Sequence, residues 1–468
     1  IMATIYGANS VSGYDVANSL RLNSGDSAQM NKTLGTATDV DKYTISMWVK
    51  RARLGHRQMM MRVIDPSSTG TYAFLEFQAG DKLASNDYDE SGSIAKITNS
   101  TNFKDISAWY HIVLALDSTQ GTASNRSKLY VNGTQITSFG TDSGGSQNQN
   151  LMGNTSGKNI YIGGDGGQDT RYCGLYMAEV CFIDGQQLTP TSFGEFDSDS
   201  PNIWKPIDVS GLTFGNNGFY LDFEDSGNLG NDANGGTDLT EVNIAATDQS
   251  TDTCTNNFAV LANHSSDDLT LTEGRLKFEN PSGGHRMVTS TIAPSQGKWY
   301  AEVKMTTEAQ STRVGVIDPA KVVYNTYIHN AGRGYAYKGN DGSSRFNDGT
   351  TDGSYGDTYT TGDIVGIAMD LDNHKLYFSK NGTFQNSGDP TSGSTGTGSA
   401  FDLATGVDYY IGASTQDQGT NPVIEFNFGS PSFAISSGNT DSAGYGNFEY
   451  SVPSGYYALN SKNLAKYG

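Results

Sequence analysis

The chain of 468 residues has little cysteine, little charge and no long apolar run. Three cysteines in a chain of this length exclude the disulfide framework of a small secreted scaffold. Basic residues number 30 against 50 acidic ones, so the formal net charge is −20. This acidity excludes the basic surface that nucleic-acid binding requires and disfavours anionic membranes. No apolar stretch approaches the roughly 18 residues of a membrane helix, so we expect no membrane insertion.

Glycine and tyrosine, in contrast, are abundant, at 57 and 26 residues. They lie with Ser, Thr, Asn and Asp between short apolar runs, a pattern typical of many short strands joined by tight turns. At roughly 100 to 200 residues per domain, the length predicts about two to four domains. We therefore expect an all-β protein with little helix.

One series of segments occurs twice. A strand, a return strand and an Asn-Gly turn follow one another in each half: Trp109–Asp117, Lys128–Val131 and Asn132-Gly133, then Asp363–Asp370, Lys375–Phe378 and Asn381-Gly382. Asn-Gly suits the positive φ angles of a type I′ hairpin turn. A Tyr-Ile-Gly segment begins at Tyr161 and at Tyr410, in both cases 29 positions after the turn asparagine. The two halves are therefore predicted to share one architecture.

Each half also alternates apolar residues along its strands. Ile112, Leu114 and Leu116 can face a second sheet while Val113 and Ala115 face away. This pattern predicts two tandem β-sandwiches of the jelly-roll type. We expect one sandwich over residues 1–224 and a polar linker with a lead-in strand over 225–273. The second sandwich, with a C-terminal extension, is expected over 274–468.

The second half resembles a SPRY domain over about Gly274 to Gly429. The resemblance rests on six segments: Lys298–Val303, Val314–Val316, Gly334–Tyr337, Gly362–Gly366, Leu376–Gly382 and Val423–Gly429. It implies a bent β-sandwich that binds partners through its loops and has no enzymatic activity of its own.

The first half, about Ser19 to Phe223, resembles the laminin-G-like or concanavalin A-like lectin group. Four segments carry that resemblance: Tyr43–Val49, Trp109–Ile112, Leu129–Gly133 and Met177–Val180. It implies a second concanavalin A-like sandwich, of a kind that binds carbohydrate or protein.

The order of the two units, with Leu188–Gly194 and Gly230–Ala233, is similar to surface fibre, appendage or capsid-decoration proteins of marine tailed bacteriophages. This resemblance implies a virion structural and display protein at the particle surface. Its partners would be other virion proteins, host-surface glycans, or both. A homo-oligomer is compatible with that role, although no heptad pattern specifies one.

The sequence carries no recognisable catalytic motif. Glycoside hydrolases need two carboxylates that face each other across the sugar. The nearest candidates, Glu76 and Glu179, each lack a carboxylate two places further on. No nucleophile elbow and no phosphate-binding loop is present either. We therefore predict a protein that is not an enzyme.

Aromatic residues beyond the needs of a core suggest a contact surface. Five residues fall where a SPRY domain begins its loop-rich binding face: Tyr324, Tyr327, His329, Tyr335 and Tyr337. Calcium is the one cofactor that the sequence leaves open, because Asp87–Glu90 and Asp165–Asp169 supply the oxygen donors that this ion prefers.

Two other functions remain open at this stage. A bacterial cell-surface lectin-like adhesin would carry an export signal or wall anchor, and the first twenty residues lack a basic segment followed by an apolar one. A glycan depolymerase would need the carboxylate pair that is missing.

Overall fold

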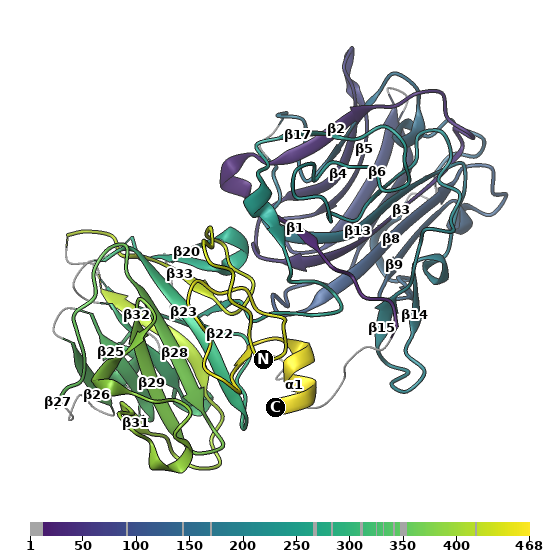
Figure 1. Cartoon of the computed structure of the whole chain (residues 1–468). Coiled ribbons are helices and arrows are strands. Elements are labelled where there is room, and N and C mark those ends of the chain that lie inside the picture. The colour runs from purple at the N-terminus through teal and green to yellow at the C-terminus, as the bar shows by residue number, and fades with distance from the viewer. Residues whose placement is uncertain are drawn as a thin grey trace. The chain divides into compact units, whose positions relative to one another are not determined.

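The computed structural model describes residues 13–89, 92–142, 145–168, 171–264, 269–281, 284–308, 312–323, 325–330, 332–339, 342–346, 353–416 and 419–468. In this part the chain forms strands, short 3-10 turns and one α-helix, α1 (Ser461–Tyr467). The chain divides into two compact units, which we call the first sandwich (Val11–Asn256) and the second sandwich (Asn257–Gly468). Each unit has two large sheets (Figure 1). None of the helices described is long and apolar enough to cross a membrane.

In the first sandwich the two sheets are named after β3 and β5. The β3 sheet has the order β10 (Thr134–Gln135), β9 (Ser127–Val131), β8 (Trp109–Asp117), β3 (Lys42–Arg51), β13 (Leu175–Asp184), β1 (Ser19–Leu22), β18 (Gln249–Ser250). The β5 sheet has the order β11 (Phe139–Asp142), β7 (Gly92–Asn99), β6 (Leu83–Asp89), β5 (Ser68–Phe77), β4 (Gln58–Asp65), β12 (Asn159–Ile162), β2 (Gln29–Thr33), β17 (Thr240–Val242). Three further short strands are β14 (Gly194–Phe196), β15 (Trp204–Pro206) and β16 (Phe219–Leu221).

In the second sandwich the sheets are named after β23 and β25. The β23 sheet has the order β30 (Thr383–Phe384), β29 (Lys375–Lys380), β28 (Ile364–Asp370), β23 (Lys298–Thr307), β33 (Val423–Asn427), β21 (Lys277–Glu279), β20 (Thr270–Thr272). The β25 sheet has the order β19 (Leu261–Asn263), β22 (His285–Ser290), β32 (Tyr410–Gln416), β24 (Arg313–Ile317), β25 (Gly334–Lys338), β26 (Ser343–Phe346), β27 (Gly353–Ser354). Two short strands, β31 (Phe401–Asp402) and β34 (Tyr457–Ala458), pair with β29 and β23.

The strand order of the two sandwiches is the same. The run β10-β9-β8-β3-β13-β1 corresponds to β30-β29-β28-β23-β33-β21, and β7-β6-β5-β4-β12-β2 corresponds to β27-β26-β25-β24-β32-β22. The predicted turns also agree, since Asn132 and Asn381 both have a φ of 47° and each is followed by a glycine at positive φ. These are the angles of a type I′ turn. The prediction of a tandem, all-β, concanavalin A-like fold is therefore confirmed.

The core of the first sandwich lies between its two sheets, as the alternation predicts. Ile112 and Leu114 of β8 pack with Met61 and Leu75 of the β5 sheet, and all four are buried. Val113 faces the other way, into a smaller apolar cluster on the far side of the β3 sheet. Burial of such side chains is the main term that stabilises the sandwich.

Residues 225–273, expected to form a polar linker with a lead-in strand, contribute strands to both sandwiches. β17 pairs with β2 and β18 with β1, while Leu229 and Leu239 lie in the first core. Further along the chain, β19 pairs with β22 and β20 with β21. The composition was misleading because a few apolar residues between polar turns are sufficient to anchor a segment to a sheet edge.

Candidate functional site

The predicted binding residues of the second sandwich divide into two groups, and Tyr324 lies outside the described residues. Tyr335 and Tyr337 are core residues with exposures of 7% and 0%. On β25 the side chains alternate, so these two point between the sheets while Ala336 points outward. They are therefore not available as a contact surface.

Tyr327 and His329 lie outside this core but are also largely covered. Their rings stack at 5.5 Å, and the guanidinium carbon of Arg313 lies 3.4 Å from the Tyr327 ring centroid. The Tyr327 hydroxyl donates to Oε1 of Gln416 at 2.8 Å, and His285 meets the Tyr327 ring edge-on at 4.2 Å. The cluster ties the connection between β24 and β25 to its own sheet.

This connection, residues 318–333, covers the outer face of the β25 sheet. It carries two 3-10 turns, η7 (Pro319–Lys321) and η8 (Ile328–Asn330). Ile328 is fully buried and packs with Met287, Ile317 and Ala336. The outer face of this sheet is therefore a second, minor core.

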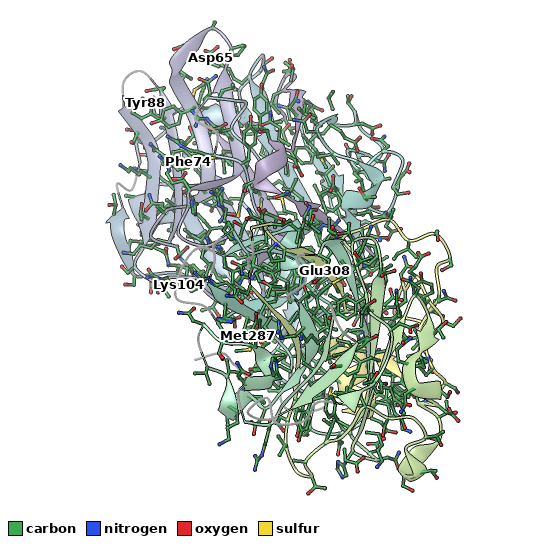
Figure 2. The ribbon with its side chains drawn as sticks, turned by 90° about the vertical axis from the view of Figure 1, so that its left-hand side faces the viewer. Asp65, Phe74, Tyr88, Lys104, Met287 and Glu308 are labelled. Carbon is green, nitrogen blue, oxygen red and sulfur yellow. The ribbon has the colours of Figure 1, made fainter. Side chains whose placement is uncertain are left out.

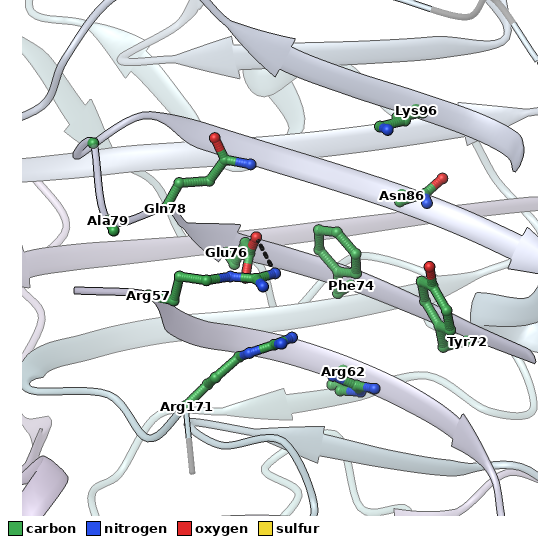
Figure 3. A pocket seen from close by; sticks show the side chains of 11 residues that line it. Arg57, Arg62, Tyr72, Phe74, Glu76, Gln78, Ala79, Asn86, Lys96 and Arg171 are labelled. Carbon is green, nitrogen blue, oxygen red and sulfur yellow. Dashed lines mark hydrogen bonds and ion pairs between the residues drawn. The ribbon is translucent and has the colours of Figure 1, made fainter. Parts of the chain in front are cut away.

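The corresponding face of the first sandwich is open, because β4 and β5 are joined through only Pro66 and Ser67. A cavity of about 630 Å³ lies on it (Figure 3). Eleven residues line the cavity: Arg57, Arg62, Tyr72, Phe74, Glu76, Gln78, Ala79, Gly80, Asn86, Lys96 and Arg171. We call it the β5-sheet cavity. Its size is within the range of about 300 to 1,000 Å³ that is typical of ligand sites.

Strand register shows how the two faces differ. Tyr161 pairs with Arg62 in the first sandwich, and its counterpart Tyr410 pairs with Ile317 in the second. One strand further, Phe74 pairs with Arg62, whereas Gly334 pairs with Ile317. The first sandwich thus has a cation and an aromatic ring at the two positions where the second sandwich has an isoleucine and a glycine beneath its covering segment.

An aromatic row crosses the open face. The Tyr72 ring stacks on Phe74 at 6.0 Å and on Tyr88 at 5.0 Å, with interplanar angles of 18° and 15°. Phe74 and Tyr88 come from neighbouring strands (Figure 2). The guanidinium of Arg62 lies 5.6 Å from the Tyr72 centroid. Such a row offers flat π faces of the kind that bind the C–H face of a sugar ring.

Among the described residues that line the cavity, Glu76 is the one carboxylate. It accepts a two-point hydrogen bond from Arg57, at 3.0 Å from Nε and 2.7 Å from Nη2. Burial raises the pKa of Glu76 above its ordinary value, although the Arg57 guanidinium opposes that shift. The other sequence candidate, Glu179, lies on β13 of the β3 sheet, so the two do not face one another across this cavity. Among the described lining residues, no second carboxylate faces Glu76 in the arrangement that a glycosidase uses.

A buried amide also lines the cavity. Asn86 is 6% exposed, and within the described part of the chain its Oδ1 has no hydrogen-bond partner. A buried oxygen without a partner is costly, and a ligand hydroxyl would satisfy it. A second cavity of about 190 Å³ adjoins the first and shares Arg62 and Tyr72 with it. The site therefore extends along the strands toward Pro66 and Gln168.

Of the calcium candidates, Glu90 and Asp169 lie outside the described residues, and Asp87 and Asp165 have structural roles in the first sandwich. Asp87 accepts hydrogen bonds from the amides of Met152 and Gly153, and burial raises its pKa to about 7. Asp165 accepts from the amides of Gly167 and Arg171. Among the described residues, no three His, Cys, Asp or Glu side chains gather in a metal-binding group.

Sequence reasoning missed the three cations Arg62, Lys96 and Arg171, which come from β4, β7 and the segment before β13. The available signal was the alternation in β5, where Tyr72 and Phe74 alternate with Ala73 and Leu75. That pattern marks an aromatic face, but only the strand register brings the cations to it.

Comparison with known proteins assigns both sandwiches. Residues 22–191 match the model of the concanavalin A-like lectin/glucanases superfamily, and residues 298–422 match that of the SPRY domain. The chain contains a concanavalin A-like domain followed by a SPRY domain. All the residues that line the β5-sheet cavity lie in the matched part of the concanavalin A-like domain.

The relatives of this two-domain chain share short regions with it. Ran-binding protein 9 of Danio rerio is 33% identical over 95 residues, which cover 20% of this chain and 16% of the relative. The Homo sapiens protein of the same name is also 33% identical over 95 residues, or 13% of its length. The chain thus matches about a sixth or less of these relatives.

Solved structures resemble both parts of the chain. The SPRY domain of human HERC1 has a TM-score of 0.28 at 16% identity, and the match covers 34% of this chain and 92% of that structure's chain. Domains LG4-5 of the mouse laminin alpha1 chain have a TM-score of 0.30 at 12% identity and cover 88% of this chain and 85% of their own.

Proposed function

We propose that this chain is a non-catalytic glycan-binding protein whose sugar site is the β5-sheet cavity of the concanavalin A-like domain. The observation that carries the proposal is the uncovered row of Tyr72, Phe74 and Tyr88 beside a polar cavity. Stacked rings hold the apolar face of a sugar, and Asn86 and Gln78 supply amides for its hydroxyls. Membership of both domains in binding-type families supports the same conclusion.

Binding without turnover follows from the chemistry of Glu76. A glycosidase acid or nucleophile needs a second carboxylate across the sugar. Glu76 instead accepts two hydrogen bonds from Arg57, so its charge is already compensated. We expect incubation with polysaccharides to release no new reducing ends.

A glycan array probed with the full chain tests this function. Wild-type protein should bind a subset of glycans, and a Tyr72→Ala/Phe74→Ala double variant should lose that binding because both stacking faces are removed. Phe196→Ala is a matched control, since Phe196 is an aromatic residue that is 48% exposed outside the cavity. Undiminished binding by the double variant would refute the proposed site.

We also propose that the chain displays its two domains at the surface of a virion, as a fibre, appendage or capsid decoration. The support is the order of the two units together with Leu188–Gly194 and Gly230–Ala233, which resemble phage surface proteins. The curated relatives named above are eukaryotic. Gold-labelled antibody against the chain should decorate purified particles in electron micrographs. Labelling of a bacterial cell envelope instead would favour the adhesin.

A further inference from the structure

We infer that Asn86 selects the sugar bound in the β5-sheet cavity by accepting a hydrogen bond from an unsubstituted equatorial hydroxyl, so that the ligand is a pyranose with glucose-like ring hydroxyls. The inference rests on the proposed function and adds the class of sugar and the residue that recognises it. It starts from the register of β5 and β6, where Tyr72 pairs with Tyr88 and Phe74 with Asn86 (Figure 3). Residues paired directly across an antiparallel ladder share one face of the sheet. We call these four side chains the β5–β6 patch.

The β5–β6 patch has three aromatic rings and one amide. The Tyr72 ring lies 5.0 Å from that of Tyr88 and 6.0 Å from that of Phe74, measured between centroids. A fourth apolar side chain would complete a surface suited to stacking alone. Asn86 instead places a carbonyl oxygen and an amide nitrogen next to Phe74. A ligand that covers the patch therefore meets flat rings and, beside them, a group that forms hydrogen bonds.

This amide lowers the stability of the folded protein. Asn86 is 6% exposed, and across the described residues its Oδ1 accepts no hydrogen bond. Another buried asparagine of the same sheet, Asn99 on β7, does have partners: its Oδ1 accepts from the Leu83 amide at 2.8 Å and its Nδ2 donates to the Thr101 carbonyl at 2.7 Å. A buried oxygen without a donor costs free energy. Residues kept at the expense of stability are typical of binding sites.

The partner that Asn86 Oδ1 lacks is a hydrogen-bond donor, because a carbonyl oxygen can only accept. An unsubstituted sugar hydroxyl donates, whereas a methyl ether, a carboxylate or a sulfate ester at the same position does not. The terminal torsion of an asparagine has broad minima, so the amide can turn its oxygen from the covered position toward the cavity that the residue lines. The ligand therefore carries a free hydroxyl at this point.

The position of Asn86 beside Phe74 also determines the direction of that hydroxyl. A pyranose stacked on Phe74 holds its C–H groups against the aromatic ring. Its equatorial hydroxyls then project in the plane of the sugar, toward the neighbouring strand, where the Asn86 Cβ lies about 4.5 to 5.5 Å from that of Phe74. An axial hydroxyl would point at the aromatic ring or away from the sheet. The hydroxyl that reaches the amide is therefore equatorial.

Ligand-observed nuclear magnetic resonance with the full chain tests this selection. The probes are methyl β-D-glucopyranoside and its derivatives with fluorine in place of the 2-, 3-, 4- or 6-hydroxyl, since fluorine cannot donate a hydrogen bond. One ring-fluorinated derivative should bind at least about tenfold more weakly than the parent, because a site built for a donor rejects an analogue without it. The epimer with the same hydroxyl axial should bind as weakly. In Asn86→Leu the parent sugar should weaken by a similar factor, and its advantage over the fluorinated sugar should disappear.

Asn86→Leu and Asn99→Leu form a matched pair, because each replaces a buried asparagine of the β5 sheet by an apolar side chain. Asn86→Leu should raise the midpoint of thermal unfolding of the first sandwich, since an oxygen without a partner is removed. Asn99→Leu should lower it, since the Leu83 amide loses its acceptor. Only Asn86→Leu should abolish the preference for the hydroxyl. A midpoint for Asn86→Leu at or below that of the wild type would show that its oxygen is already satisfied, and would overturn the inference.

Other outcomes separate the inference from the proposed function. If glycans bind through Tyr72 and Phe74 but Asn86→Leu leaves their affinities unchanged, the glycan site stands and the role of Asn86 is refuted. Binding of a galactoside and a mannoside in preference to the glucoside, or a loss confined to the 6-fluoro derivative, would overturn the class of sugar. If no glycan binds and the Tyr72→Ala/Phe74→Ala double variant changes nothing, the proposed function fails and the inference fails with it.

Discussion

The two sandwiches share a strand order and differ in what covers one face of one sheet. In the SPRY domain, residues 318–333 fold over the β25 sheet and bury Ile328 against it. In the concanavalin A-like domain the equivalent connection is Pro66 and Ser67, and the β5 sheet carries a cavity. The same sheet thus becomes a minor core in one domain and a candidate binding face in the other. The length of one loop thus goes with whether this face of a sandwich is covered or open.

Side chains on the two faces have changed together with the loop. Ile317 and Ala336 are fully buried beneath the SPRY connection, where long or charged side chains would not fit. Arg62 and Tyr72 are partly exposed on the open sheet. A buried polar group needs a hydrogen-bond partner. The face covered by the long loop therefore carries apolar side chains, and the face left open by the short loop carries charged ones.

The largest effect is expected from loosening the cover of the SPRY domain. Ile328→Ala removes a fully buried side chain from the outer cluster. It should lower the free energy of unfolding of this domain by about 2 to 5 kcal/mol, through lost burial and the cavity left behind. Denaturant unfolding monitored by hydrogen exchange of β25 would measure the loss.

Val323→Ala is the control for that experiment, because Val323 lies on the same connection and is 50% exposed. Its effect should stay within about 0.5 kcal/mol. Glycan binding by the concanavalin A-like domain should be unchanged in both variants. A similar loss of unfolding free energy in Ile328→Ala and Val323→Ala would contradict the view that one buried side chain holds the connection in place.

A second comparison concerns one buried glutamate in each domain. Burial raises the pKa of Glu179 to about 7, and that of Glu302 to about 7. The folded state therefore holds a proton that the unfolded chain releases above about pH 4.5, so the free energy of unfolding falls as the pH rises from about 4.5 to about 7. Glu179→Gln should remove a fall of up to about 3 kcal/mol. Thermal unfolding across that pH window would detect it.

Glu302→Gln should behave differently. Glu179 accepts from the hydroxyls of Tyr220 and Tyr14, which can turn to donate or accept. Glu302 accepts from the backbone amides of Glu449 and Tyr450, which can only donate. A glutamine amide would face one of these donors with its own N–H, so this variant should be less stable at every pH, by about 1 to 3 kcal/mol. Equal behaviour of the two variants would disprove this account.

The next effect tests whether the open face can be made to resemble the covered one. Arg62→Ile places in the β5 sheet the residue found at the corresponding SPRY position, Ile317. It should weaken glycan binding in the β5-sheet cavity by about 1.5 to 3 kcal/mol, since a charged hydrogen-bond donor that lines the site is lost. Stability should change little, because Arg62 is partly exposed. If a titration shows unchanged affinity, Arg62 does not contribute to the site.

The sequence predicts the local part of this structure well. The alternation of apolar residues correctly predicted that Ile112 and Leu114 face the second sheet, and the two Asn-Gly turns have the predicted angles. Both signals involve neighbours along the chain. The same alternation, applied to β25, would have placed Tyr335 and Tyr337 inward, on the side opposite to the small residue Ala336. The shared strand face of these two tyrosines left a core position open to them, and their assignment to a contact surface depended on a family resemblance.

The cavity could not be predicted in the same way, because it depends on pairing between distant strands. Arg62, Lys96 and Arg171 lie far apart in the sequence and meet only through the order β7-β6-β5-β4 and the segment that follows β12. The strand pairing of residues 225–273 could not be predicted for a related reason. Leu229 and Leu239 are isolated in a polar stretch, and only the folded sheet shows that both are core residues.

The smallest effect concerns the turn that the two domains share. Asn132 and Asn381 adopt the same left-handed φ. Each side-chain Oδ1 accepts from a backbone amide near the start of a long strand, His111 of β8 at 2.8 Å and Ile364 of β28 at 2.9 Å. Replacement of either residue by alanine should cost about 1 to 2 kcal/mol, from the strained φ and the lost hydrogen bond. Replacement by glycine removes only the hydrogen bond and should cost less.

Because the two turns have the same geometry, the two alanine costs should agree within about 0.5 kcal/mol in domain-resolved unfolding. A clear difference would show that Trp204, which packs over Gly133, and Tyr450, which packs over Gly382, do not support their turns equally.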